Sequence, residues 1–229
     1  MTTVNQSKSN LKEKGEHNMN KPLWIVVTGL DGSGKTNLVS NLAEYYRKKG
    51  LRVKTAHLPF DTHLQQDVLP KLGTHRYADR LLFALDNHVF ASQVEEWTDE
   101  NECDLIISQR GFFDSFVHGS VQGFSYSFIA DLNQIEDLPE CDVMIHLCAN
   151  ADVAYNRIKN DPDADKFEYP KYIRRQEMMT RAGYNDLING DPDLLAFAEC
   201  KNLFIDTTRI SIEETFEKSK RFLESLKLF

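Results

Sequence analysis

The chain has 229 residues and a formal net charge of −8, with 41% hydrophobic and 10% aromatic residues. This length fits a single domain with a sizeable core. The acidic balance argues against a general affinity for nucleic-acid backbones. We also expect no membrane association, because no apolar stretch approaches the roughly 18 residues of a spanning helix and no signal-peptide segment is recognisable.

Two further features of the sequence indicate how the chain is organised. Residues 1–20 are polar and rich in Asn, Lys and Ser, so we expect this segment to be disordered and residues 21–229 to form one folded domain. The four cysteines are widely spaced and show no metal-ligand pattern, which favours buried thiols over disulfides or a zinc site. The expected setting is therefore a reducing cytoplasm.

The first predicted element is a buried strand over residues 23–27, followed by a glycine-rich loop and a helix from residue 37. The loop, residues 29–36, has the pattern G-x-x-x-x-G-K-[ST], which cradles phosphates between backbone N–H groups and a helix N-terminus. Its lysine can reach the β- and γ-phosphates, and its threonine can ligate Mg²⁺. The chain is therefore expected to bind a nucleoside triphosphate. The expected phosphate-binding residues are Gly29, Gly32, Ser33, Gly34, Lys35, Thr36 and Asn37.

The rest of the chain alternates between apolar runs and amphipathic stretches. The further predicted strands cover residues 52–58, 103–108, 142–148 and 202–206. Helical spacing is found over residues 64–101, 113–136, 151–159, from about 169, and 211–226, where Ser211 and Glu214 form a capping box. This alternation predicts an α/β protein: a three-layer P-loop NTPase fold with a five-stranded parallel sheet flanked by helices. Ligands of such sheets bind beyond the carboxyl ends of the strands, where residues 57–60 and 109–110 are expected.

Several segments in this order resemble the thymidylate kinases, P-loop kinases that transfer the γ-phosphate of ATP to dTMP. They are residues 29–36, 81–88, 108–112, 165–168 with Tyr184, and 204–206 followed by 212–214. The resemblance covers nearly everything from residue 23 to 226. It implies ATP and Mg²⁺ as cofactors, small nucleotides as substrates, a mobile lid, and a homodimer packed through helices near residues 80–130.

The resemblance also assigns roles to individual residues. Asp31 is expected to link the metal and the acceptor sugar, and Arg110 to hold the acceptor phosphate with a bidentate guanidinium. Pro59 and Phe60 are expected beside the substrate, and Phe83 is expected to stack on the base. The residues alone favour these roles for Asp31 over a solvated loop acid and for Arg110 over a surface ion pair, whereas Phe83 alone is equally compatible with a core residue.

The lid should lie within residues 157–168 and supply positive charge to the migrating phosphoryl group. Arg157 and Lys166 are the catalytic candidates there. Arg174 or Arg175 from the following helix is a further possibility. Each of these side chains is also compatible with a solvated helix surface.

Two positions depart from the family pattern. Gln109 stands where a carboxylate is expected, and an amide cannot serve as a proton acceptor in its place. Asn87 stands where an arginine is expected to contact the base, and an amide both donates and accepts. A base with an amino group or a modified pyrimidine then becomes an alternative to thymine. The alternatives for the whole protein are a kinase of nucleosides or small metabolites, and an ATP-binding regulatory protein with weak transfer activity.

Overall fold

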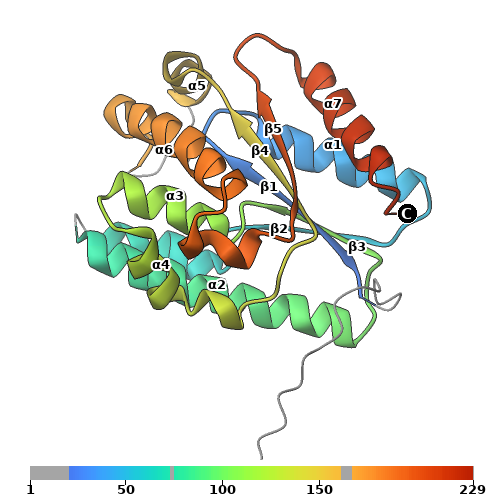
Figure 1. Cartoon of the computed structure of the whole chain (residues 1–229), viewed down its shortest axis with the longest axis horizontal. Coiled ribbons are helices and arrows are strands. Elements are labelled where there is room, and N and C mark those ends of the chain that lie inside the picture. Colours follow the sequence, from blue (N-terminus) through green and yellow to red (C-terminus); the bar gives the residue numbers. More distant parts are fainter. Residues whose placement is uncertain (1–20, 73–74, 161–166, 229) are drawn as a thin grey trace, which may run out of the picture.

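The computed structural model describes residues 21–72, 75–160 and 167–228, and its centre is a five-stranded parallel sheet (Figure 1). The strands are β1 (Leu23–Gly29), β2 (Val53–His57), β3 (Leu105–Gln109), β4 (Val143–Cys148) and β5 (Lys201–Asp206). They lie in the order β2-β3-β1-β4-β5, and every pair is parallel. The predicted α/β architecture and all five predicted strands are confirmed.

Helices cover both faces of the sheet because the central strands β1 and β4 present buried side chains on both faces. Leu23, Ile25 and Val27 of β1 pack with α1 (Lys35–Lys48) and α7 (Ile212–Ser225). Trp24 and Val26 face the opposite core, and Figure 1 shows the helices that enclose it. These are α2 (Arg76–Asp99), α3 (Phe113–Val121), α4 (Tyr126–Asn133) and α6 (Pro170–Ile188). A short helix, α5 (Ala151–Ile158), packs with α6 near the carboxyl ends of the strands.

Two predicted helices are divided in the structure. The segment expected as one helix over 64–101 begins with a π-helical turn at Leu64–Val68 and a 3₁₀ turn at Leu69–Leu72, before α2 begins at Arg76. Pro70 within this segment lacks the N–H that a continuous helix requires. The segment 113–136 is divided by Gly123, whose φ of +86° ends α3. Ser125 then caps α4 by accepting a hydrogen bond from the backbone N of Phe128 (3.2 Å).

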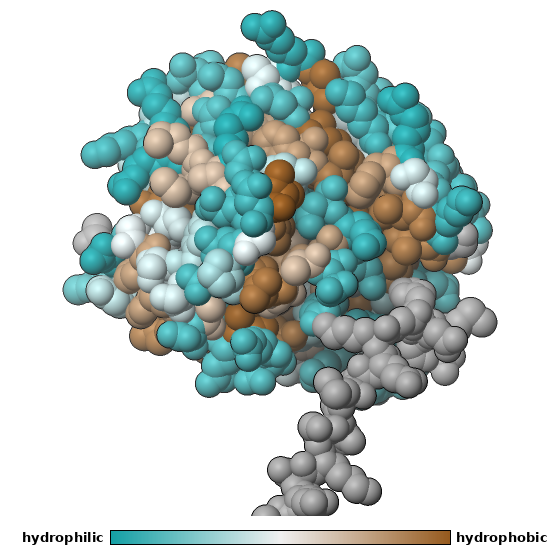
Figure 2. Space-filling view, in the orientation of Figure 1, coloured by the Kyte–Doolittle hydropathy of each residue, from teal (hydrophilic) through white to brown (hydrophobic). Residues whose placement is uncertain are grey.

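Short 3₁₀ turns at Ile135–Asp137 and Pro192–Phe197 connect the remaining elements. Hydrophilic residues cover most of the face seen in Figure 2, and hydrophobic residues show in patches between them. No helix among the described residues is long and apolar enough to cross a membrane. All four cysteines are buried thiols. The sulfur atoms of Cys141 and Cys200 lie 3.0 Å apart, a proximity that their sequence spacing did not suggest.

Candidate active site

The phosphate loop between β1 and α1 requires its glycines for steric reasons. A Cβ at Gly29 would lie 1.9 Å from the carbonyl O of Leu147, and one at Gly32 would lie 2.3 Å from the carbonyl O of Ala154. Gly34 has a φ of +100° and precedes the first residue of α1. The loop therefore lies against β4 and α5, and the N–H groups at the start of α1 are directed to its interior.

Lys35 is buried and held inside this loop. Its Nζ donates to the carbonyl oxygens of Gly29 (2.9 Å) and Leu30 (3.0 Å) and to Asp31 Oδ1 (3.0 Å). Burial lowers the pKa of Lys35, and the carboxylate of Asp31 opposes that change. The ammonium is thus placed where phosphate oxygens would replace backbone carbonyls as its partners.

Arg110 follows β3 and meets Asp31 from the opposite side. Its φ of +67° is unusual for a residue with a side chain and directs the guanidinium into the cleft. Nη2 donates to Asp31 Oδ1 (2.5 Å), and Nη1 donates to the carbonyl O of Leu58 (3.3 Å). Burial raises the pKa of Asp31, but the attraction of Arg110 and Lys35 is larger and holds this pKa well below its usual range. Asp31 is therefore a buried carboxylate and not a solvated loop acid.

The second carboxylate oxygen of Asp31 is bound by a residue that sequence reasoning missed. Gln176 on α6 donates from Nε2 to Asp31 Oδ2 (3.2 Å), and the same nitrogen lies 3.3 Å from His118 Nε2. His118 Nδ1 lies 2.9 Å from the hydroxyl of Tyr172. Burial, and then the nearby Arg110, lower the pKa of His118 to about 3, so the ring is neutral. This chain of contacts connects the phosphate loop to α3 and α6.

A cavity of about 520 Å³ opens over the phosphate loop. Most of the expected phosphate-binding residues line it, with Thr36 and Asn37 exposed to solvent. Gln109 and His57 lie on one wall, and burial followed by Arg110 lowers the pKa of His57 to about 4. Ile210 and Ile212, from the segment after β5, form an apolar wall.

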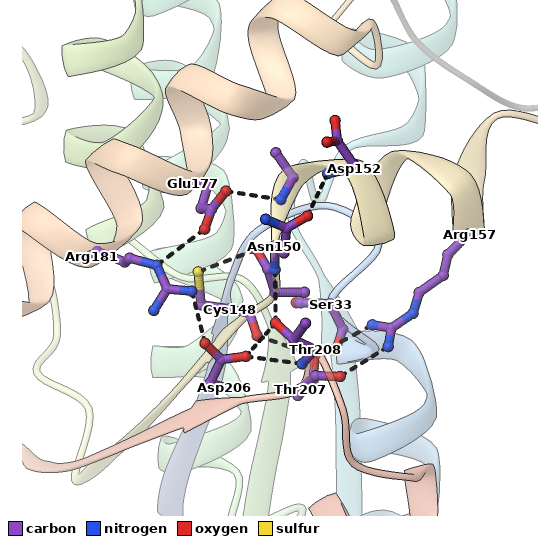
Figure 3. A network of polar contacts seen from close by, with 12 residues as sticks. Ser33, Cys148, Asn150, Asp152, Arg157, Glu177, Arg181, Asp206, Thr207 and Thr208 are labelled. Carbon is purple, nitrogen blue, oxygen red and sulfur yellow. Dashed lines mark hydrogen bonds and ion pairs between the residues drawn. The ribbon is translucent and has the colours of Figure 1, made fainter.

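Arg157 lies at the end of α5 and contacts the back of the phosphate loop, as Figure 3 shows. Its Nη1 donates to the carbonyl O of Gly32 (3.1 Å), and its Nη2 donates to the carbonyl O of Thr207 (2.9 Å). Thr207 Oγ1 lies 2.9 Å from the carbonyl O of Ser33, so the segment after β5 supports the loop directly. Sequence reasoning identified Arg157 but not Thr207, which belongs to no motif.

A second cavity adjoins the first and is lined by part of α2. Pro59, Phe83, Asn87, Asp31 and Arg110 line it, as expected from the sequence. Further lining residues that sequence reasoning did not single out are Leu58, Leu69, Arg80, Asp86, Gly111, Asp114, Ser115, His118 and Phe167. The two cavities share Asp31 and Arg110.

Phe60 occupies a different place from the one expected. Its ring packs in the core against Phe90, at 5.2 Å between centroids, and against Trp97. Its backbone N donates to both carboxylate oxygens of Asp86 (2.9 and 2.8 Å), and Asp86 Oδ1 also accepts from the backbone N of Asp61 (2.8 Å). The aromatic residue after β2 therefore anchors the loop that positions Pro59.

The residue expected to contact the base, Asn87, is buried in a polar network. Its Nδ2 donates to Ser115 Oγ (2.9 Å) and to Asn133 Oδ1 (2.7 Å). Asn133 Nδ2 in turn donates to the carbonyl O of Ile129 (2.7 Å). A carbonyl only accepts, so this last bond fixes the direction of both amides.

Of the basic residues expected in or after the lid, Arg157 lines the first cavity. Lys166 falls outside the described residues. Arg174 donates to Asp152 (3.1 Å) on an exposed surface. No group of three or more His, Cys, Asp or Glu side chains suited to a metal ion occurs within residues 21–72, 75–160 and 167–228.

Comparisons with known proteins agree with this geometry. The family model described as thymidylate kinase matches residues 27–200. A probable thymidylate kinase of Metallosphaera sedula is 30% identical over 148 residues, covering 63% of this chain and 69% of that protein. One of Sulfurisphaera tokodaii is 25% identical over 207 residues, covering 90% and 97%.

Solved structures show the same fold. The crystal structure of thymidylate kinase from Ehrlichia chaffeensis superposes with a TM-score of 0.62 at 19% identity, over 89% of this chain and 99% of that one. The phosphate loop, the two adjoining cavities and the family match over most of the sheet lead to one assignment. The chain belongs to the thymidylate kinase family and is a nucleotide-binding kinase.

Proposed function

We propose that this enzyme transfers the γ-phosphoryl group of Mg²⁺-bound ATP to a pyrimidine deoxynucleoside monophosphate such as dTMP. The observation that carries this proposal is the meeting of two cavities at Asp31 and Arg110. One cavity is built on the phosphate loop, and the other is lined by the Phe83 ring and the Asn87 amide, which are suited to a nucleobase. A donor in the first and an acceptor in the second would place their phosphates side by side.

The donor would lie over the start of α1. Lys35 would exchange its carbonyl partners for β- and γ-phosphate oxygens, and the exposed hydroxyl of Thr36 would ligate the Mg²⁺ carried by the triphosphate. Both oxygens of Asp31 already accept hydrogen bonds from Lys35, Arg110 or Gln176. Because of these contacts, we expect Asp31 to hold the cationic side chains of Lys35 and Arg110 in place and not to coordinate the metal directly.

The acceptor phosphate would be bound by Arg110. A guanidinium suits a phosphate dianion, and the pairing with Asp31 fixes its orientation before substrate arrives. Gln109 at the mouth of the first cavity can donate a hydrogen bond but cannot accept a proton as a carboxylate would. Catalysis would then depend on alignment and on stabilisation of charge, with no protein base.

A panel of acceptors tests this proposal. The protein is mixed with ATP and Mg²⁺ and with dTMP, dUMP, dCMP, dAMP, dGMP and thymidine, and ADP release is followed by a coupled assay. We expect turnover with a pyrimidine deoxynucleoside monophosphate. Turnover with thymidine alone would support the nucleoside kinase instead, and ATP binding without turnover of any acceptor would support a regulatory protein.

We further propose a homodimer formed through α2. This helix presents an exposed apolar stripe of Tyr77, Leu81, Leu85 and Val89, between 37% and 59% exposed, on the side away from Phe83 and Asn87. Such a stripe is unfavourable in water unless it is covered. Sedimentation of the wild type should give a dimer, and Leu81→Glu with Leu85→Glu should give a monomer. A monomeric wild type would contradict this proposal.

A further inference from the structure

Cys141 and Cys200 form a buried pair of thiols that the proposed function does not use. Cys141 lies two residues before β4 and Cys200 lies directly before β5, and these strands are parallel neighbours (Figure 1). The two sulfur atoms are 3.0 Å apart, although 59 residues separate the cysteines in the chain. Cys141 is 9% exposed and Cys200 is 6% exposed. The fold therefore brings two thiols into contact at the amino ends of the strands, opposite to the phosphate loop.

The hydrogen bonds of the pair distinguish the two thiols. Cys200 Sγ lies 2.7 Å from the carbonyl O of Cys141, and because a carbonyl only accepts, the Cys200 thiol is the donor. In the contact between the two sulfur atoms, the proton then comes from Cys141 and Cys200 accepts it. This hydrogen bond to Cys200, followed by burial, raises the pKa of the Cys141 thiol. The arrangement thus keeps a proton on Cys141 and directs it at Cys200, whose thiolate is the nucleophile once it forms.

The cavities beside the pair also differ. Cys200 lines a cavity of about 480 Å³, together with Lys201, Asn202 and the exposed Ile188. Cys141 lines a separate apolar cavity of only about 10 Å³. The wider cavity therefore gives a small oxidant in solution a path to Cys200.

We propose that Cys141 and Cys200 are a disulfide site, in which a peroxide oxidises Cys200 and Cys141 then closes the bond. The Cys200 thiolate attacks one oxygen of hydrogen peroxide, the O–O bond breaks, and the leaving hydroxide takes up a proton to form water. Cys141 then attacks the sulfur of the Cys200 sulfenic acid: the S–S bond forms, the S–O bond breaks, and the hydroxide leaves with the Cys141 proton as a second water. Two thiols lose two electrons, and one peroxide is reduced to two waters.

The geometry requires little movement for this step. An S–S bond is about 2.05 Å long, so the two sulfur atoms have to approach by about 1 Å. Cys148 has no comparable arrangement, because its Sγ contacts the carbonyl O of the adjacent Ala149 (3.8 Å). The expected disulfide is therefore specific for one pair.

The disulfide would close residues 141–200 into a loop. This part of the chain contains α5 and α6, which supply Arg157 and Gln176 to the phosphate loop. Closing a loop of this length restricts the unfolded chain more than the folded one and so stabilises the folded protein. Because the bond lies at the amino ends of the strands, it leaves the two cavities at their carboxyl ends open.

Peptide mapping of the wild type tests the proposal. The folded protein is treated with hydrogen peroxide, its remaining thiols are blocked with iodoacetamide, and it is digested without a reductant for mass spectrometry. We expect one cross-link between the peptides of Cys141 and Cys200, with a mass lower by two hydrogen atoms, that dithiothreitol removes. The Tm of the oxidised protein should rise by roughly 4–16 °C and return to its original value after reduction.

Two variants complete the test. Cys141→Ser removes the second thiol and should abolish both the cross-link and the rise in Tm. Cys103→Ser is the matched control, because Cys103 is also buried and lies two residues before β3, as Cys141 does before β4. This variant should keep both the cross-link and the rise in Tm.

Each outcome decides for or against the proposal. Absence of a cross-link in the oxidised wild type, or a cross-link that includes Cys103 or Cys148, would overturn it. A disulfide between Cys141 and Cys200 that leaves the Tm unchanged or lowers it would overturn the stabilising role. The peptide map needs no variant, so it is decisive even where Cys141→Ser does not fold. Neither measurement uses a nucleotide, so failure of the proposed function would leave this inference standing.

Discussion

Asp31→Asn is the substitution that most directly tests the charge arrangement of the site. The Asp31 side chain is buried and contacts Lys35 Nζ (3.0 Å), Arg110 Nη2 (2.5 Å) and Gln176 Nε2 (3.2 Å). Asparagine has nearly the same shape and can still accept from one donor. It carries no charge, however, so Lys35 and Arg110 would remain buried without their common counter-ion.

The expected loss of stability follows from this geometry. Removing one partner of a buried ion pair typically costs about 3–5 kcal/mol, and the isosteric asparagine places the effect near the lower value. In a domain of this size, about 3 kcal/mol corresponds to a fall in Tm of roughly 6–12 °C. The Asp31 pKa is depressed in the folded protein, so this stabilisation is present above its ordinary value of 3.8 and disappears as the pH falls through the folded pKa. The difference in the free energy of unfolding between variant and wild type should therefore reach its full size at pH 7.

The measurement is thermal and urea unfolding at pH 7, with and without ATP. Because the triphosphate supplies negative charge to the same two cations, ATP should raise the Tm of Asp31→Asn more than that of the wild type. Asp152→Asn is the matched control: its partner Arg174 lies at 3.1 Å, but both side chains are more than 60% exposed, so we expect a change below about 0.5 kcal/mol. An Asp31→Asn protein as stable as this control would refute the reasoning.

Three other predictions concern the loop and the core. Gly29→Ala should destabilise by more than about 4 kcal/mol because its Cβ would overlap the carbonyl O of Leu147, whereas Gly50→Ala, with open space around it, should cost about 1 kcal/mol in urea unfolding. Burial lowers the pKa of His146 to about 4, so the unfolded chain takes up a proton that the folded one does not. The contribution of His146 to stability should thus fall by about 1.4 kcal/mol per pH unit between pH 6.5 and about 4, and His146→Gln should reduce the slope by this amount and leave the contributions of His57 and His118. Lys35→Ala should reduce transfer by roughly 10²–10³-fold in the coupled assay, and an unchanged rate would contradict the assigned donor site.

Local patterns in the sequence were sufficient for most of the fold. The three central strands β1, β3 and β4 are short apolar runs that are almost entirely buried in the parallel sheet, and the edge strands β2 and β5 are more exposed. Helix interruptions were harder to predict, because the apolar spacing over residues 113–136 continues across Gly123. The division into α3 and α4 depends on the positive φ of that glycine and on the cap at Ser125. Neither feature alters the hydrophobic period from which the helix was inferred.

Some residues of the candidate site could likewise be identified from the sequence, and others could not. The phosphate loop is contiguous, so its residues could be identified from spacing alone. Gln176 lies 145 residues from Asp31 in the chain, and nothing in the sequence around it indicates that contact. Phe60 was misplaced because an aromatic residue after a strand is compatible with either a site or a core. The hydrogen bonds to Asp86, which turn its backbone, exist only once α2 has packed against the loop.

The departure at Asn87 shows why a motif position cannot be interpreted by itself. From the sequence, an amide in place of arginine suggests a site open to amino-bearing bases. In the folded protein the carbonyl O of Ile129 orients Asn133, Asn133 orients Asn87, and only an acceptor is left toward the cavity. The structure thus leaves an acceptor at Asn87, where the sequence suggested a group that both donates and accepts.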